Sequence, residues 1–159
     1  MAVIMIVAVF ASILFASHRY ILRRARGVDC QGHLRQIHLA LDGYLSDHNL
    51  QIPVMRATRA DKSDGVEPPT MDVLLAPYID NVASFKCPAD NEDHQKSGCS
   101  YYWNSLLNGQ TSWRLNFLTI TDEPKIPLFA DKGPWHTGFG DHVNVLYADG
   151  HVEKDFQFW

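Results

Sequence analysis

The 159-residue chain carries 14 lysines and arginines against 18 aspartates and glutamates, which gives a net charge of −4 at neutral pH. An acidic chain without a polybasic field is not expected to bind nucleic acid. Its hydrophobic fraction of 46% is enough for one ordinary core, so length and composition predict a single domain with an appendage.

The chain opens with an apolar segment. Residues 1–17 contain no charged side chain, and a helix of that length spans about 26 Å, close to the roughly 30 Å of a bilayer's hydrocarbon core. No basic region precedes the run, as it would in a signal peptide. The pattern therefore predicts a membrane or filament-core helix over residues 1–25. We expect this helix to pack through Met1, Ile4, Met5, Val9, Phe10, Ile13 and Leu14.

Two features that follow the apolar run give opposite orientations for the soluble part. Four arginines stand at positions 19, 23, 24 and 26, and the positive-inside rule would keep them in the cytoplasm. Cys87 and Cys99, in contrast, bracket a short polar loop, and a disulfide there would add about 2–3 kcal/mol in an oxidising compartment. Removal of a basic leader ahead of Met1 would reconcile the two. Cys30–Cys87 is the alternative pairing, and three buried thiols remain a third interpretation.

The next segment predicts an amphipathic helix over residues 26–48. Leu34, Ile37, Leu41, Tyr44 and Leu45 form one stripe at helical spacing. No proline separates this stripe from the apolar run, so one helix is expected to continue to about residue 47. A proline-rich loop follows over residues 49–69, and then a short helix over residues 70–80 that Thr70 caps and Pro77 limits.

The rest of the chain, residues 99–159, predicts a small antiparallel sheet. Short β-prone runs occupy residues 100–104, 116–120, 125–131, 142–148 and 151–159. Asp149-Gly150 favours a two-residue type I′ turn between the last two runs. We expect Val143, Val145 and Tyr147 to face the helical stripe. The predicted fold is α+β, with a long N-terminal helix whose outer half packs on the sheet.

Histidines and aspartates cluster toward the C-terminus. His136, His142 and His151 alternate with Asp131, Asp141 and Asp149, without the spacing of a helical zinc pair. Calcium prefers carboxylate and carbonyl oxygens from irregular loops. The candidate ion at this end is therefore calcium, with Asp131, Asp141 and Asp149 as its weak candidate ligands, and a catalytic zinc is less favoured.

Several segments together carry a resemblance to a known group of proteins. The apolar helix followed by RRAR, then CQGHLRQIHLALDGYLSDHN, FKCPAD, SYYWN, IPLFAD and HVNVLYADGHV, resembles the pilin-like proteins of planctomycete and verrucomicrobial bacteria. These are similar to the major pseudopilins of type II secretion and share a C-terminal domain named for a histidine, a spacer and Asp-Gly. The resemblance implies a pilin-like fold and makes His136, Asp149 and Gly150 the motif residues. The sequence departs from that pattern at Met5, where the family has glutamate, and near Leu22, where many relatives have a proline.

The resemblance implies a structural, non-enzymatic subunit of a pilus-like filament or secretion pseudopilus. Its partners would be further copies of itself or other pseudopilins. It would reside in the inner membrane before assembly and in a periplasmic or extracellular filament afterwards. Mass spectrometry of the N-terminus would show whether Met1 is a processed, methylated end. The alternative is a membrane-anchored periplasmic protein that uses the C-terminal His/Asp loop for metal-dependent chemistry, or that binds a ligand through Trp103, Trp113 and Trp135.

Overall fold

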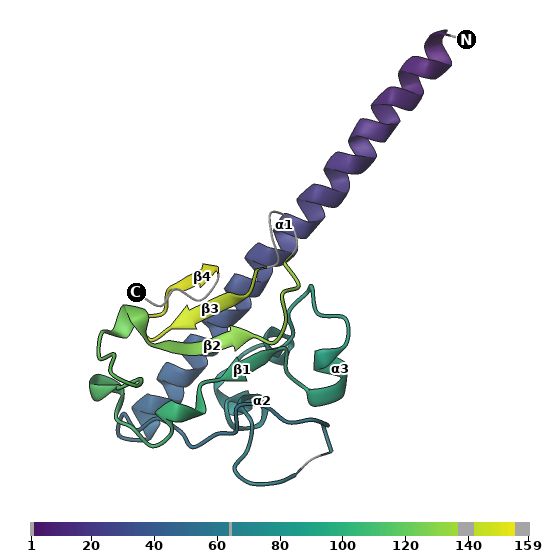
Figure 1. The fold of residues 1–159 in the computed structure, drawn as a ribbon. Coiled ribbons are helices and arrows are strands. Elements are labelled where there is room, and N and C mark those ends of the chain that lie inside the picture. The colour runs from purple at the N-terminus through teal and green to yellow at the C-terminus, as the bar shows by residue number, and fades with distance from the viewer. Residues whose placement is uncertain (1, 64, 137–141, 155–159) are drawn as a thin grey trace.

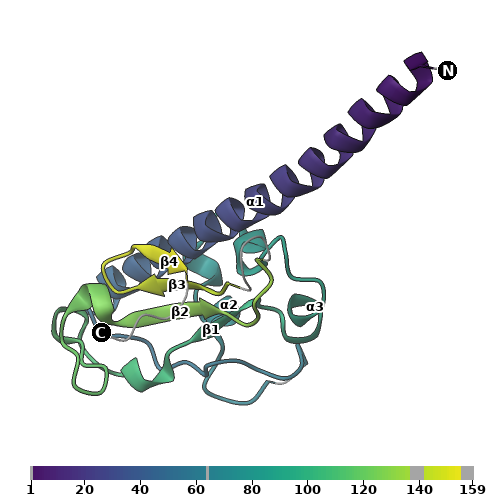
Figure 2. The same cartoon turned by 45° about the horizontal axis from the view of Figure 1, so that its top comes forward.

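A single long helix organises the molecule. The computed structural model describes residues 2–63, 65–136 and 142–154. Helix α1 (Ala2–Asp47) is 46 residues long and extends about 69 Å at 1.5 Å per residue. Its first half projects away from the rest of the protein, and its second half lies along the sheet (Figures 1 and 2). The prediction of one continuous helix to about residue 47 is confirmed.

The sheet is an antiparallel meander in the order β1-β2-β3-β4. Its strands are β1 (Tyr101–Trp103), β2 (Pro127–Asp131), β3 (Asn144–Tyr147) and β4 (Val152–Lys154). Each strand pairs with the next one along the chain, so this sheet contains no crossover. A long N-terminal helix with a small antiparallel sheet is an α+β arrangement, as predicted.

Between α1 and β2 the chain forms short helical elements and irregular connections. The α-helices are α2 (Met71–Leu74) and α3 (Asp93–Ser97). The 3₁₀ turns are η1 (Ala76–Tyr78), η2 (Val82–Phe85), η3 (Ser105–Leu107), η4 (Ser112–Arg114) and η5 (Glu123–Lys125). The expected helix over residues 70–80 therefore divides into α2 and η1. Thr70 precedes it but does not cap it, because its hydroxyl donates to the Asp72 carboxylate.

The core lies between the second half of α1 and the sheet. Leu34, Ile37 and Leu41 are at most 1% exposed, which confirms the stripe read from the sequence. They belong to one hydrophobic cluster with residues of β1, β2 and β3, including Trp103, Phe129 and Leu146. Burial of a leucine-sized side chain contributes about 1.5–3 kcal/mol, so this layer fixes the sheet onto the helix.

The face of β3 that meets α1 differs from the prediction. Gln31 on α1 donates to the side-chain oxygen of Asn144 at 3.3 Å, and Leu146 belongs to the core cluster. Val145 and Tyr147 are also buried, but they alternate with Leu146 and therefore point to the other side of the sheet. Alternation misled the prediction because β3 is buried on both faces.

The β3–β4 turn also differs from the predicted type I′ geometry. The N–H of Gly150 donates to the carbonyl of Tyr147 at 2.9 Å, and the N–H of Tyr147 donates to the carbonyl of His151 at 3.0 Å. The loop therefore runs from Ala148 to Gly150, and within it only Gly150 takes a positive φ, of 84°. A tight turn followed by a left-handed glycine is a common three-residue hairpin.

One predicted strand folds back on itself instead of joining the sheet. Within residues 116–120, Phe117 and Ile120 exchange two backbone hydrogen bonds of 2.9 Å and form an isolated bridge. Leu118 has a φ of +58°, which is incompatible with an extended strand. Of the last predicted strand, residues 155–159 lie outside the described residues.

The Asp90 carboxylate and Gly98 stand at the two ends of helix α3. The Asp90 carboxylate accepts the backbone N–H groups of Glu92, Asp93 and His94 at 2.8–2.9 Å and the Ser100 hydroxyl at 2.5 Å. At the other end Gly98 is left-handed, with φ +86°.

A mostly buried ion pair lies beside Gly98. It joins Arg59 of the 49–69 loop to Asp72 of α2. A Cβ atom at Gly98 would meet the Arg59 guanidinium and would come within 2.8 Å of the Asp72 carboxylate. The loop, α2 and the end of α3 are therefore packed around one point.

Candidate functional site

The projecting half of α1 is apolar and exposed. Ile4, Met5, Phe10 and Leu14 are each 63–72% exposed, although side chains of this kind are normally buried. These are four of the seven residues predicted to form an assembly core; the side chains of Met1, Val9 and Ile13 lie outside the described set. By length and composition, α1 can cross a membrane. We refer to residues 2–25 as the arm.

Arginines mark the end of the arm nearest the domain. The guanidinium of Arg19 lies 5.9 Å from the centre of the Phe15 ring, and that of Arg24 lies 5.6 Å from the centre of the Tyr20 ring. Such contacts let a cationic side chain lie along an apolar surface while its charge stays near solvent. The apolar surface of the arm therefore ends in a zone of positive charge before the domain begins.

Four side chains with metal-ligating atoms converge where the arm meets the domain. They are Cys30 of α1, Cys87 after η2, Asp131 at the end of β2, and His136 in the segment that follows β2. One ligand atom from each lies within 4.8 Å of those of the other three. Both cysteines are 0% exposed, and the side chains of Asp131 and His136 are 0% and 5% exposed. We call these four residues the junction cluster.

The contacts within the junction cluster are short. The Cys30 thiol donates to Asp131 Oδ1 at 3.1 Å. His136 Nε2 lies 3.1 Å from Asp131 Oδ2 and 3.4 Å from Cys87 Sγ. The same imidazole nitrogen thus faces both the carboxylate and a sulfur. His136 Nδ1 is buried and has no hydrogen-bond partner among the described residues.

Neighbouring residues hold the junction cluster in place. Asn144 donates to Asp131 Oδ2 twice, from its backbone N–H and from its side-chain amide, at 2.8 Å each. The Ser100 hydroxyl accepts the backbone N–H of Cys87 at 2.9 Å. The Tyr101 hydroxyl lies 3.5 Å from Cys30 Sγ. The polar Asn144 on the inward face of β3 is explained by this role.

The junction cluster perturbs the protonation of its own members. The interaction between the Cys30 and Cys87 side chains lowers the pKa of Cys87 to about 6, against the raising effect of burial and with help from His136. The same interaction, with burial and the Asp131 charge, raises the pKa of Cys30. Burial alone would lower the pKa of His136, but Asp131 and Cys87 raise it to about 9. Anionic sulfur is therefore stabilised at Cys87, beside a second sulfur and a carboxylate.

The cysteines do not form the favoured disulfide. All three thiols are free and buried, and the Cys99 sulfur accepts the backbone N–H of Tyr101 at 3.4 Å, apart from the junction cluster. The predicted Cys87–Cys99 bridge is therefore absent, because Cys87 faces the other members of the cluster while Cys99 packs beside α2 and the 49–69 loop. The alternative partners, Cys30 and Cys87, do lie together, but as thiols.

Two of the predicted calcium ligands, Asp131 and Asp149, are not brought together. Asp131 is surrounded by two sulfurs and an imidazole, which is not the oxygen environment that calcium requires. Asp149 lies in the turn at the far end of β3, where it bonds to His151. Asp141 lies outside the described residues. Of the motif residues, His136 belongs to the junction cluster, whereas Asp149 and Gly150 form the hairpin turn.

The tryptophans proposed as ligand contacts differ in exposure. Trp103 is buried in the core and Trp113 is 68% exposed. Trp135 is partly buried and packs against the core cluster. Their burial differs because one belongs to a strand of the sheet, whereas the others lie in a turn and in the segment after β2.

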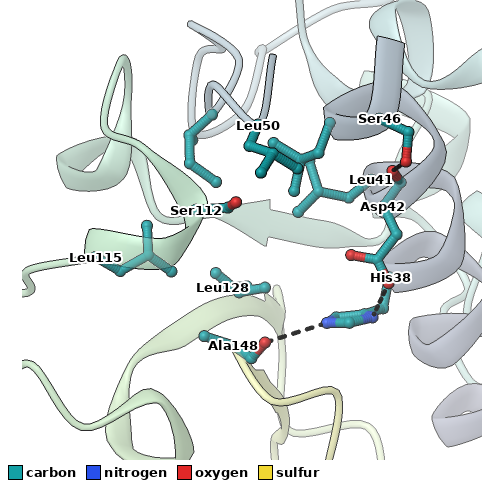
Figure 3. A pocket seen from close by; sticks show the side chains of 11 residues that line it. His38, Leu41, Asp42, Ser46, Leu50, Ser112, Leu115, Leu128 and Ala148 are labelled. Atoms are coloured by element: carbon teal, nitrogen blue, oxygen red, sulfur yellow. Dashed lines mark hydrogen bonds and ion pairs between the residues drawn. The ribbon is translucent and has the colours of Figure 1, made fainter. Parts of the chain in front are cut away.

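One surface pocket lies between the end of α1 and the β3–β4 turn (Figure 3). There His38 Nε2 lies 3.3 Å from the carbonyl of Ala148, and Nδ1 lies 3.3 Å from the Asp42 carboxylate. Both ring nitrogens are therefore already engaged with the protein. The pocket offers no convergence of reactive groups comparable with the junction cluster.

Sequence reasoning singles out each member of the junction cluster but not the group. Cys30 and Cys87 are disulfide candidates, Asp131 is a calcium candidate and His136 is a motif residue. No local spacing links positions 30, 87, 131 and 136, because the fold alone brings them together. A comparison of the chain with protein-family models, curated proteins and solved structures finds no match.

Proposed function

We propose that this protein is a structural subunit of a pilus-like filament or secretion pseudopilus, with a pilin-like fold and no enzymatic role. Before assembly the arm resides in the inner membrane. After assembly the arms of many copies, or of this chain and other pseudopilins, pack together, and the sheet domains face outward in the periplasm or outside the cell.

The observation that carries this proposal is the exposed arm. An isolated soluble subunit rarely leaves large apolar side chains on every side of a helix in water. At about 25 cal/mol per Å² of apolar surface removed from water, transfer of the arm into a bilayer or a helical bundle is strongly favourable. The net charge of −4 helps to keep the sheet domains soluble. It also gives the chain as a whole no electrostatic attraction toward nucleic acid.

The division of α1 into two halves also supports the proposal. The arm projects from the domain, whereas the second half of the helix is buried against the sheet, and the helix runs unbroken between them (Figures 1 and 2). A bundle of such arms would supply lateral packing along a filament axis. This is the arrangement that the resemblance to pilin-like proteins implies.

A charge placed in the arm tests the proposal. Phe10, 63% exposed in the single subunit, is replaced by aspartate, and filaments are counted by electron microscopy of cells that make the variant. An unpaired carboxylate in a packed bundle costs several kcal/mol. We therefore expect Phe10→Asp to abolish filaments, and Val9→Asp one residue earlier to do the same.

The matched control is Val54→Asp, a similar change on the domain surface, where Val54 is 55% exposed. This variant should assemble as the unaltered protein does. Normal filaments from Phe10→Asp would contradict the proposal. Membrane-bound protein that never yields filaments, in the unaltered chain or in either variant, would instead show that the arm serves only as a membrane anchor.

A further inference from the structure

We propose that Cys30, Cys87, Asp131 and His136 bind one Zn²⁺ ion, which fastens α1 to the sheet domain at the base of the arm. The ion has a structural role. The inference is independent of filament assembly, because it depends only on the interior of the domain.

The two contacts of His136 have the spacing of ligand pairs in a tetrahedral zinc site, and all four ligand atoms lie within 4.8 Å of one another. Zinc bonds are about 2.3 Å to sulfur and about 2.0–2.2 Å to nitrogen and oxygen. Tetrahedral geometry then places a nitrogen and an oxygen about 3.3 Å apart, and a sulfur and a nitrogen about 3.5 Å apart. The corresponding distances are 3.1 Å between His136 Nε2 and Asp131 Oδ2, and 3.4 Å between His136 Nε2 and Cys87 Sγ.

A catalytic Cys-His-Asp triad uses the same residue types but needs another geometry. In a triad one imidazole nitrogen faces the nucleophile and the other faces the carboxylate. In this protein Nε2 of His136 faces both Cys87 and Asp131, while Nδ1 is buried and bonds to neither. The imidazole cannot pass a proton between two partners on its one nitrogen. Convergence of two sulfurs, a nitrogen and an oxygen on one point is instead what a metal ion requires.

The ligand types select zinc among common biological metals. Two thiolates and an imidazole are soft or borderline donors, whereas calcium and magnesium take oxygen ligands. Four protein ligands complete a tetrahedral shell, so no position remains for a substrate or a reactive water. All four side chains are at most 5% exposed. The site is therefore closed and structural.

The hydrogen bonds around Asp131 are those of a supported metal ligand. Metal-bound carboxylates are usually oriented by donors from outside the ligand set, and Asn144 gives Asp131 two such bonds of 2.8 Å. Gln31, next to Cys30 on α1, bonds in turn to Asn144. The ion would neutralise most of the negative charge that two thiolates and a carboxylate place in the interior, where unpaired charge is costly.

The position of the junction cluster explains what the ion does for the fold. Cys30 is the first fully buried residue of α1 as the helix enters the domain, since residues 17–29 are exposed or half-buried. Of the other three ligands, Cys87 follows η2, Asp131 ends β2 and His136 lies just after β2. Zinc thus joins the helix to two parts of the domain that are far from it in sequence.

The test is a metal assay on the full-length chain, extracted in detergent and purified without chelators. Inductively coupled plasma mass spectrometry should find about one zinc per chain. Cys30→Ser and Cys87→Ser should each lose most of this zinc. Cys99→Ser is the matched control, because Cys99 is also buried but lies outside the junction cluster, and it should keep its zinc.

A second measurement on the unaltered chain covers the case in which the cysteine variants fail to fold. Removal of zinc with a strong chelator should lower Tm by about 5 °C or more, and addition of zinc should restore it. Cobalt bound in place of zinc should show the intense visible bands of a tetrahedral site with thiolate ligands.

Three results would overturn the inference. The first is unaltered protein that lacks zinc and whose Tm does not respond to zinc or chelator. The second is a Cys30–Cys87 disulfide, found by peptide mapping without reductant, in place of the metal. The third is zinc loss from Cys99→Ser as large as that from Cys30→Ser. None of these bears on filament formation, which the Phe10→Asp experiment tests separately.

Discussion

Leucine-to-alanine substitutions on the two halves of α1 should have opposite consequences. Leu34 is 0% exposed in the core, whereas Leu14 is 69% exposed on the arm. Truncation of a fully buried leucine costs about 2.7–5 kcal/mol, because transfer free energy is lost and a cavity remains. Truncation of a side chain already in solvent changes the free energy of unfolding by no more than about 0.5 kcal/mol.

Thermal unfolding converts these free energies into a measurable difference. For a domain of roughly this size, 1 kcal/mol corresponds to about 3–5 °C in Tm. Leu34→Ala should therefore lower Tm by about 10–20 °C, and Leu14→Ala by no more than about 2 °C. Near-ultraviolet circular dichroism in detergent follows the packing of Trp103 against Phe129, whose ring centres are 4.9 Å apart, and so reports the domain and not the arm.

Equal losses of stability in the two variants would refute this reasoning, because they would mean that the arm packs on the domain. In an assay of filament assembly, the two variants should rank in the opposite order, provided that both are folded. At a temperature where both variants are folded, Leu14→Ala should assemble less well than the unaltered chain, since the proposed bundle would bury its side chain. Leu34→Ala should assemble normally at that temperature.

Further substitutions test local features of the domain. Gly98→Ala should lower the free energy of unfolding by more than Gly109→Ala in chemical denaturation, because both glycines have positive φ but only Gly98 lies against a buried ion pair; equal losses would argue against the clash. Asp90→Ala should cost about 2–4 kcal/mol, since it removes the acceptor for three backbone hydrogen bonds at the start of α3 and for one from the Ser100 hydroxyl, and a loss below about 1 kcal/mol would contradict that role. Gly150→Val should cost over about 1 kcal/mol by the same assay, because φ is +84° and the new side chain would meet the His38 ring at 3.3 Å; an unchanged midpoint would show that the turn adapts.

The helical half of the fold was predictable because its signal is local. The stripe from Leu34 to Leu45 repeats at about 3.6 residues and occupies one face only, so the buried side follows from the sequence. The same logic failed at β3. All four of its residues are buried, and the alternating valines then mark neither face as the inward one. The residue that does identify the inward face is Asn144, whose partner Asp131 lies 13 positions away.

The junction cluster was not predictable as a unit for a related reason. Metal motifs are recognised when pairs of ligands share one turn or one helix, and here the ligands come from widely separated segments. Chemical type was the usable signal, since cysteine, histidine and aspartate are the residues that bind zinc. Only the fold shows that two of the three cysteines lie beside one particular histidine and one particular aspartate.

The unbroken passage of α1 from arm to domain would determine how neighbouring subunits meet in the proposed filament. Each residue of an α-helix turns the chain by about 100° and advances it by about 1.5 Å. The number of residues between the arm and the domain therefore sets the orientation of the domain about the axis of α1. One alanine inserted between Arg24 and Ala25 would turn the sheet domain by about 100° around the axis of α1 relative to the arm, while leaving the interior of the domain intact. Insertion of four residues would return it to within about 40° of its original bearing, about 6 Å farther out.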